Sequence, residues 1–337
     1  MSFPELVFLE NLIGDIKDKA RIEEVARIPY MQERFPIYTL AFGSKDPRAP
    51  TLALVGGVHG QEKIGSQVVL TFLETMTRLL DWDDSIHQLL EHMRIVFLPI
   101  ANPVGMFLLR RGNGNRVDLM RNGPFDGPSP TTFFLGGQRV SKYLPWYRGV
   151  KGAPMELESQ VLCDFIQREV FPAKVSIALD VHSGFGAIDR LWFPYSHTIQ
   201  PYPQLAEAYA LKTLLDETYP NHVYRMEPTA QGYTISGDLW DYLYLEHQKK
   251  ELGFFFPMTL EMGSWLWLKK NPAQIFSSLG LFHPMHLHRH KRILRRHLTL
   301  FDFLQRATVS SKVWTQLNPE DRAENQKRAL DYWYYET

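Results

Sequence analysis

The sequence predicts an α/β protein with a twisted, mixed and mostly parallel β-sheet that is covered by helices on both faces. Short apolar runs alternate along the chain with segments of helical periodicity. The runs are nearly continuous in Val, Ile, Leu and Phe, which is typical of strands that are buried on both faces. Polar residues of chemical interest follow the ends of several runs, where ligands bind in such folds.

Seven runs have the length and composition of buried strands, and five segments have a helical period. The expected strands are 35–42, 51–58, 94–100, 175–182, 191–195, 222–226 and 254–262. The expected helices are 62–80, 156–170, 203–218, 236–247 and 285–306. We expect a single domain over residues 1–310, with its motifs at about 50–265, and a C-terminal helical extension over 311–337.

The segment 112–152 is rich in Gly, Pro, Asn and Ser and is expected to form long loops. A linker between two domains is the alternative, but aromatic residues run through the segment and linkers seldom contain them. We therefore expect these loops to border a functional site. The His- and Arg-rich run 283–297 is expected to be a basic helix and not a second metal site, since its histidines do not share one helix face.

The charge and cysteine content exclude several kinds of partner and compartment. Lys+Arg and Asp+Glu both number 37, so neither nucleic acid nor an anionic membrane is expected as a partner. The single cysteine, Cys163, rules out an intramolecular disulfide framework. The first residues lack a basic stretch before a long apolar core, and no window is apolar enough to span a membrane. We expect a cytoplasmic protein, although export without a signal peptide stays open, and the oligomeric state is not indicated.

The pentapeptide VHGQE (58–62) follows the apolar run 51–58 and places His59 and Glu62 three residues apart. A hydrolytic zinc site needs three protein ligands and an open position, and two histidines with one glutamate are an established set. His182, at the end of the run 175–182, is a candidate for the third ligand. A plain strand–turn–helix junction with polar residues is the alternative that the spacing alone leaves open.

Seven sequence elements, in chain order, resemble those of the zinc carboxypeptidase family, and they span roughly residues 50 to 265. They are GGVHGQE (56–62), ANPVG (101–105), RGNGNRVDLMRN (111–122), ESQVLCDFI (158–166), DVHSG (180–184), YTISGDLWD (233–241) and TLEMGS (259–264). The resemblance implies one Zn²⁺ ion held by His59, Glu62 and His182. It also implies that Glu261 is the general base that activates a zinc-bound water.

The resemblance assigns further roles to polar residues of these elements. Arg111 matches an arginine that stabilises the oxyanion, although the adjacent Arg110 is an alternative occupant of that position. Asp118 matches an aspartate that orients the first histidine. Arg121 matches the arginine that binds the terminal carboxylate of the substrate. Tyr233 matches a mobile tyrosine that covers bound substrate.

Two positions bear on substrate choice. Met120 stands where the family has an asparagine that shares the terminal carboxylate with the arginine, and a thioether is a poor hydrogen-bonding partner. Trp240 matches a position near the floor of the side-chain pocket, where a large indole would shorten the pocket or stack on what enters it. The expected function is hydrolysis of a peptide or peptide-like amide beside a carboxylate-bearing terminal residue. An N-acyl amino acid deacylase, with an acyl-amino-acid substrate, is one alternative, and an inactive binding protein with the same fold is another.

Overall fold

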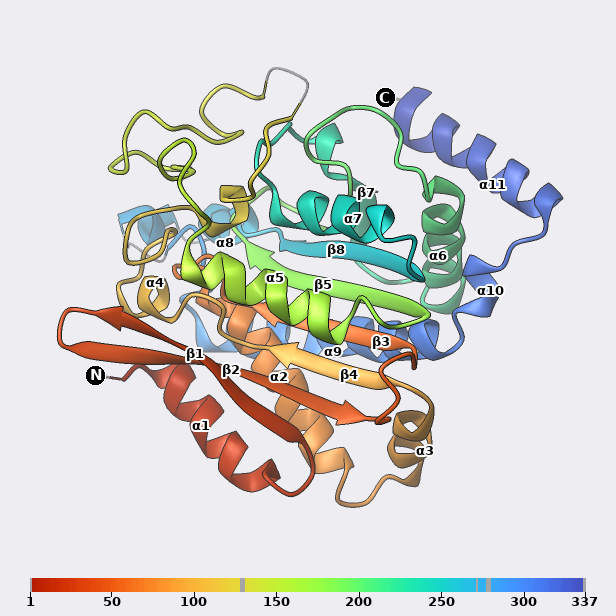
Figure 1. Cartoon of the computed structure of the whole chain (residues 1–337), viewed down its shortest axis with the longest axis horizontal. Helices are drawn as coiled ribbons and strands as arrows, with labels where there is room; N and C mark the ends of the chain where they lie inside the picture. Colours follow the sequence, from red (N-terminus) through yellow and green to blue (C-terminus); the bar gives the residue numbers. More distant parts are fainter. Residues whose placement is uncertain (1, 128–130, 271, 277–279, 336–337) are drawn as a thin grey trace.

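The computed structural model describes residues 2–127, 131–270, 272–276 and 280–335, and its described strands form one eight-stranded sheet (Figure 1). The strand order is β1-β2-β4-β3-β5-β8-β6-β7. The strands are β1 (Arg21–Tyr30), β2 (Glu33–Gly43), β3 (Thr51–Gly56), β4 (Arg94–Leu98), β5 (Val175–Ser183), β6 (Asp189–Phe193), β7 (Tyr224–Pro228) and β8 (Phe254–Met262). The pairs β3–β4, β3–β5, β5–β8 and β6–β7 are parallel, and β1–β2, β2–β4 and β6–β8 are antiparallel. The prediction of a mixed, mostly parallel sheet is confirmed.

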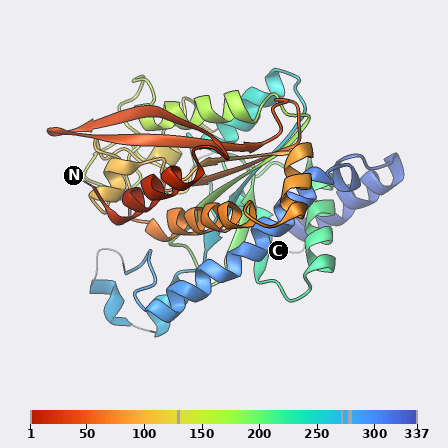
Figure 2. The same cartoon turned by 90° about the horizontal axis from the view of Figure 1, so that it is seen from below.

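Helices cover both faces of the sheet, as predicted (Figure 2). On one face α2 packs against β3, β5, α1 and α9, and on the other α5 packs with α7. The helices are α1 (Pro4–Ile16), α2 (Lys63–Leu79), α3 (Asp84–His92), α4 (Pro103–Phe107), α5 (Leu157–Glu169), α6 (Leu205–Thr218), α7 (Leu239–Lys249), α8 (Trp265–Lys270), α9 (Leu287–Val309), α10 (Lys312–Thr315) and α11 (Pro319–Leu330). Short 3-10 turns lie at Leu119–Arg121, Thr229–Gln231 and Pro272–Phe276, and a π-helical turn at Asp331–Tyr335 follows α11.

The central strands are buried on both faces, which explains why their sequences are nearly continuous apolar runs. Every residue of β3 and β4 is buried, and so is every residue of β5 except the first. The edge strand β1 differs, because it pairs only with β2 and most of its residues are at least partly exposed. Its polar sequence, RIEEVARIPY, matches this half-exposed position.

One strand, β1, and four helices, α1, α3, α4 and α8, were not among the expected elements, and two strands lie two residues away from their expected positions. β6 ends at Phe193 because Pro194 follows and cannot donate a ladder hydrogen bond. β7 begins only at Tyr224, after a turn in which the Nδ1 atom of His222 accepts from the Tyr224 backbone N–H.

The C-terminal helices pack against the body of the protein. α11 lies along α6, and Trp333 buries its indole and donates a 2.8 Å hydrogen bond to the carbonyl of Met226. The boundary at residue 310, between the single domain and the C-terminal helical extension, stays a prediction. Within the described part of the chain, no helix is both long and apolar enough to cross a membrane.

The strand order brings distant segments to one edge of the sheet. β3, β5 and β8 are parallel neighbours, so their carboxyl ends lie side by side. His59 follows β3, His182 lies near the end of β5, and Glu261 lies opposite His182 in the β5–β8 register. The fold therefore assembles the predicted site at the position where α/β sheets bind ligands.

Candidate metal centre

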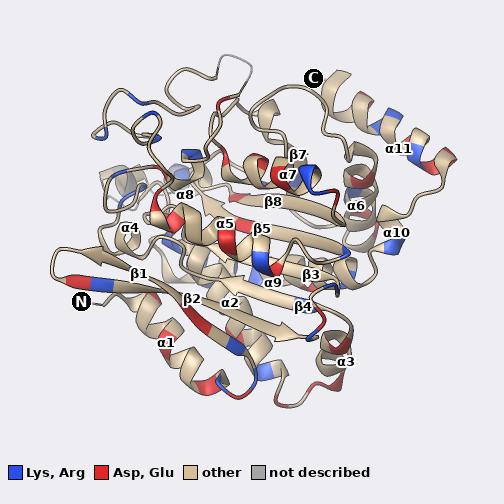
Figure 3. Ribbon diagram, in the orientation of Figure 1, with Lys and Arg blue, Asp and Glu red and all other residues tan. Residues whose placement is uncertain are grey.

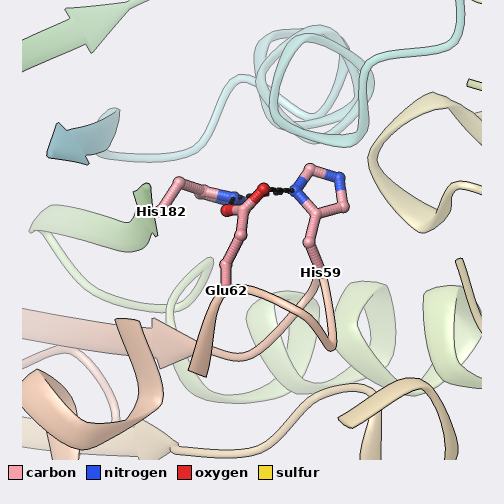
Figure 4. Close-up of side chains that lie close together, drawn as sticks. All are labelled: His59, Glu62 and His182. Atoms are coloured by element: carbon pink, nitrogen blue, oxygen red, sulfur yellow. Dashed lines mark hydrogen bonds and ion pairs between the residues drawn. The ribbon is translucent and has the colours of Figure 1, made fainter. Parts of the chain in front are cut away.

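Three side chains from the carboxyl ends of β3 and β5 point toward one another (Figure 4). His59 Nδ1 lies 3.0 Å from Glu62 Oε1, and His182 Nδ1 lies 3.0 Å from Glu62 Oε2. The two Nδ1 atoms are 3.1 Å apart, and all three residues are buried. These residues form the single cluster, within the described ranges, of three or more His, Cys, Asp or Glu side chains placed to hold a metal ion.

Glycines allow the backbone segments of this site to approach closely. A Cβ atom on Gly60 would lie 2.0 Å from the carbonyl carbon of Gly105, at the start of α4. A Cβ atom on Gly65, in the first turn of α2, would lie 2.2 Å from the carbonyl oxygen of Val181. Larger residues at these positions would push His59 and Glu62 away from His182.

A carboxylate orients each histidine. Asp118 Oδ1 lies 3.0 Å from His59 Nε2, and Asp180 Oδ2 lies 2.7 Å from His182 Nε2. An ionised carboxylate only accepts hydrogen bonds, so each Nε2 carries the proton and each Nδ1 presents its lone pair to the centre. This pairing is the usual support of metal-bound histidines.

The donor set fits a zinc ion. Two nitrogen lone pairs and a carboxylate that face one another repel unless a proton or a cation lies between them. Ligands about 2.0–2.1 Å from a tetrahedral Zn²⁺ lie roughly 3.3 Å apart, and the observed separations of 3.0 and 3.1 Å are close to this value. Burial alone would lower the pKa of His182, but Asp180 and Glu62 together raise it well above its usual range. Protons and metal therefore compete for the same site.

Two arginines surround the carboxylate of Asp118. Arg111 Nε donates to Asp118 Oδ2 at 2.7 Å, and Arg121 Nη1 donates to the same oxygen at 3.1 Å. Burial opposes ionisation of Asp118, but Arg111 and Arg121 hold its pKa well below the usual range. Arg111 Nη1 also donates to Glu62 Oε1 at 3.1 Å, so Arg111 lies beside the ligands. Arg110 lines the same cavity without such a contact in the described structure, which favours Arg111 for the role beside the reacting carbonyl.

Glu261 lies near the end of β8, opposite His182 in the register of β5 and β8. Its Oε1 accepts a 2.8 Å hydrogen bond from the backbone N–H of Phe185. Burial and the neighbouring charge of Glu62 raise the pKa of Glu261 to about 8. A carboxylate with a raised pKa can exchange a proton with a reacting group near neutral pH.

The metal-binding cluster opens into a cavity of about 770 Å³. The other predicted site residues that line it are Asp118, Arg121, Met120, Tyr233 and Trp240. Tyr233 packs against Phe185 and Trp192, with ring centroids 5.6 and 5.9 Å apart. Because Tyr233 is enclosed, burial raises the pKa of its hydroxyl. The structure thus brings every predicted site residue to one cavity.

One functional residue was not predicted from the sequence. Asp180 orients His182, and its Oδ2 also accepts a 3.0 Å hydrogen bond from the indole Nε1 of Trp240. The signal was present in the motif DVHSG, because residues two apart on a strand project from the same face. Trp240 was expected to shorten the pocket or to stack on what enters it, and its indole also donates to Asp180, which orients His182.

Comparisons with known proteins agree with this geometry. A family model described as zinc carboxypeptidase matches residues 20–271. Carboxypeptidase E of Caenorhabditis elegans is 33% identical over 134 residues, which are 34% of this chain and 28% of that protein. Human carboxypeptidase D is 24% identical over 136 residues, which are 36% of this chain and 10% of that protein. The chain therefore aligns with only a minor part of each of these relatives.

Solved structures share the fold at low sequence identity. Bovine thrombin-activatable fibrinolysis inhibitor, solved with tick carboxypeptidase inhibitor, superposes with a TM-score of 0.64 at 18% identity. That match covers 94% of this chain and 99% of that chain. Carboxypeptidase A from Helicoverpa armigera superposes with a TM-score of 0.62 at 18% identity, over 90% of this chain and 71% of that chain.

Proposed function

The chain belongs to the zinc carboxypeptidase family and is a metallocarboxypeptidase-type hydrolase, and we propose that it releases a carboxylate-bearing terminal residue from a peptide or a peptide-like amide. The observation that supports this most directly is the joint presence in one cavity of His59, Glu62, His182 and Glu261. One Zn²⁺ ion held by the first three residues would supply a Lewis acid that polarises the scissile carbonyl and lowers the pKa of water.

The side chains around this centre have complementary roles in the proposed reaction. Glu261 removes a proton from the attacking water and later delivers it to the leaving nitrogen. Arg111 stabilises the negative charge that develops on the carbonyl oxygen in the transition state. Arg121 binds the terminal carboxylate with its planar guanidinium group, and Tyr233 closes over the bound residue.

Deacylation of an N-acyl amino acid is a second candidate, and Met120 is the observation that favours it. Met120 is 6% exposed and lines the cavity next in sequence to Arg121. Its thioether cannot donate to the terminal carboxylate, so Arg121 has less support in recognising a free C-terminus. An inactive binding protein is less well supported, because all the residues that the reaction requires are present.

We also propose a cytoplasmic location, which is supported by the single, buried Cys163 and the absence of any possible disulfide within the chain. Burial raises the pKa of this thiol far above its ordinary value, so Cys163 is an inert core residue.

The experiment that tests the proposed function combines metal analysis with a substrate panel. The purified protein would be assayed for bound zinc and incubated with a mixed library of peptides and N-acyl amino acids. Bound zinc with turnover that disappears in Glu261→Gln, while the exposed control Glu217→Gln retains activity, would support the proposal. Turnover that survives in Glu261→Gln, or a protein that binds no zinc, would contradict it. Cleavage of peptides or of acyl-amino acids then decides between the two candidates.

A further inference from the structure

Three basic side chains that line the cavity have no acidic partner. Arg110, Arg116 and Lys142 all contribute to its wall, and none makes an ion pair with an acid in the part of the chain that the structure describes. Arg116 and Lys142 both approach the ring of Tyr143, at 5.0 and 5.6 Å from its centroid. Two of the three basic groups therefore lie against one exposed aromatic ring. Figure 3 shows blue segments along the loops beyond the strand ends.

The loop that bears Arg110 and Arg116 is firmly held. The side-chain oxygen of Asn113 accepts from the backbone N–H groups of Asn115 and Val117, at 3.0 and 3.1 Å. Its amide nitrogen donates to Glu156 and Glu158, at the start of α5. Glu156 and Glu158 thus bind the amides of this loop, and neither makes an ion pair with Arg110 or Arg116 within the described structure.

The acids of the cavity are also engaged elsewhere. Glu62 and Asp118 face the histidines and Arg111, and Glu261 accepts from the backbone of Phe185. Asp238 caps the N-terminus of α7, and Asp241 accepts from Ser196 and His197. Among the described residues, none of these lining carboxylates makes an ion pair with Arg110, Arg116 or Lys142.

The acidic and the basic side chains of the cavity differ in how deeply they are buried. The acids Asp238 and Asp241, like Trp240, are buried, whereas Lys142 is exposed and Tyr143 is 72% exposed. Lys142, and Arg116 through its contact with the ring of Tyr143, therefore lie at the mouth of the cavity, and the partly buried Arg110 lines its wall. If the proposed function holds, the terminal residue of the substrate occupies the closed end, and the acyl portion leaves through the mouth past these groups.

We propose that Arg110, Arg116 and Lys142 form a subsite for a second carboxylate, which belongs to the acyl portion of the substrate. Guanidinium groups bind carboxylates in a planar, bidentate geometry, and Arg116 and Lys142 both contact the ring of Tyr143. The carboxylate comes either from an acidic residue upstream of the scissile bond or from a dicarboxylic acyl group. Both sources would place a carboxylate group at the mouth of the cavity.

The test compares substrates that differ only in this charge. One pair is N-acetyl-Glu-X and N-acetyl-Gln-X, and the other is succinyl-X and its neutral amide succinamoyl-X, where X is the best terminal residue from the panel above. A preference for the anionic member of the first pair would indicate recognition of an acidic residue. A preference within the second pair would indicate recognition of a dicarboxylic acyl group. We expect kcat/KM for the anionic member of at least one pair to be about fivefold higher, and the preference to decrease with added salt.

Variants then locate the subsite. Arg116→Gln and Lys142→Gln should each reduce the preference, and the double variant should bring the ratio close to one. Lys151→Gln removes an exposed positive charge that does not line the cavity, so it should keep the wild-type ratio. Equal rates within both pairs for the wild type, or a preference that survives in the double variant, would overturn the proposal.

Failure of the proposed function would look different, because neither member of either pair would then be turned over. In that case the same pairs are titrated calorimetrically into Glu261→Gln with zinc added. Tighter binding of an anionic member, lost in the Arg116→Gln/Lys142→Gln variant, supports the subsite. Equal binding, or no binding of either member, overturns it.

Discussion

Asp180 binds the Nε2 nitrogen of His182 at 2.7 Å through one carboxylate oxygen, while its other oxygen is buried and has no hydrogen-bond partner among the described residues. The side chain is fully buried, so its charge is stabilised mainly by the imidazole ring and by the indole N–H of Trp240. Asp180 therefore increases the basicity of His182 and fixes the ring in the orientation that binds metal.

Asp180→Asn is expected to lower zinc affinity by about 10- to 100-fold, because an amide cannot hold the imidazole N–H as a charged acceptor does. Competition with a zinc chelator measures this change. Asp164→Asn, at an exposed position of α5, is the control and should bind zinc like the wild type. Wild-type affinity in Asp180→Asn would show that backbone placement alone fixes His182.

The activity should increase with pH as Glu261 loses its proton. The pKa of Glu261 is raised to about 8 by burial and by Glu62, and a general base acts only in its ionised form. Bound zinc adds positive charge nearby and lowers this pKa, so the midpoint of kcat/KM should lie between about 4.3, the ordinary value for a glutamate, and about 8. A pH profile of kcat/KM measures it. The same ascending limb in the residual activity of Glu261→Gln would assign the titration to another group.

Met120→Asn is expected to improve binding of substrates with a free terminal carboxylate. The new amide would add a donor beside Arg121 in the cavity wall. A hydrogen bond to a charged group contributes about 1.5–3 kcal/mol, which corresponds to a KM lower by about 10- to 150-fold. Steady-state kinetics with a peptide acid measure the change, and the matching peptide amide is the control. An equal effect on both substrates would mean that position 120 does not meet the carboxylate.

Acid should destabilise the protein partly through His247. The ring is fully buried between Phe171 and Phe255, and neither nitrogen has a hydrogen-bond partner within the described structure. Burial and Lys250 lower the pKa of His247 to about 4, whereas an unfolded histidine titrates near 6.5. Between these values the unfolded chain binds the extra proton, so stability falls as the pH decreases from 6.5 to 4, by up to about 3 kcal/mol.

His247→Leu should remove this part of the pH dependence. Urea unfolding at pH 7 and at pH 4.5 should show a smaller loss of stability in the variant than in the wild type. The loss is not abolished, because burial also lowers the pKa of His297 to about 4. His92→Gln, at an exposed position, is the control. An unchanged difference between the two pH values would mean that His247 is protonated without penalty.

The interior of the fold could be predicted from the sequence because its strands are buried on both faces. β3, β5 and β8 each have a nearly continuous apolar sequence, which a segment with a solvent-exposed face would not have. β1 was not predicted, because an edge strand that is largely exposed has no such apolar run. Its pairing with β2 is also a contact that the local sequence does not encode.

The site was predictable to the extent that its residues occur in motifs. His59 and Glu62 are three residues apart, and His182 ends another apolar run. The resemblance of the ordered motifs indicated Glu261. The link from Asp180 to Trp240 could not be predicted in this way, because it joins β5 to α7 across 60 positions. The mouth of the cavity likewise depends on how the loop of Arg116 meets that of Tyr143, which only the folded chain shows.

The indole of Trp240 and the imidazole of His182 share a single acceptor oxygen on Asp180. A residue of the proposed substrate pocket and a proposed metal ligand are therefore not free to change separately over evolutionary time. Descendants of this sequence that replace Trp240 to admit a larger terminal residue would have to supply another donor to Asp180, or tolerate a weaker metal site. The range of substrates open to such a lineage is limited by the stability of its metal centre.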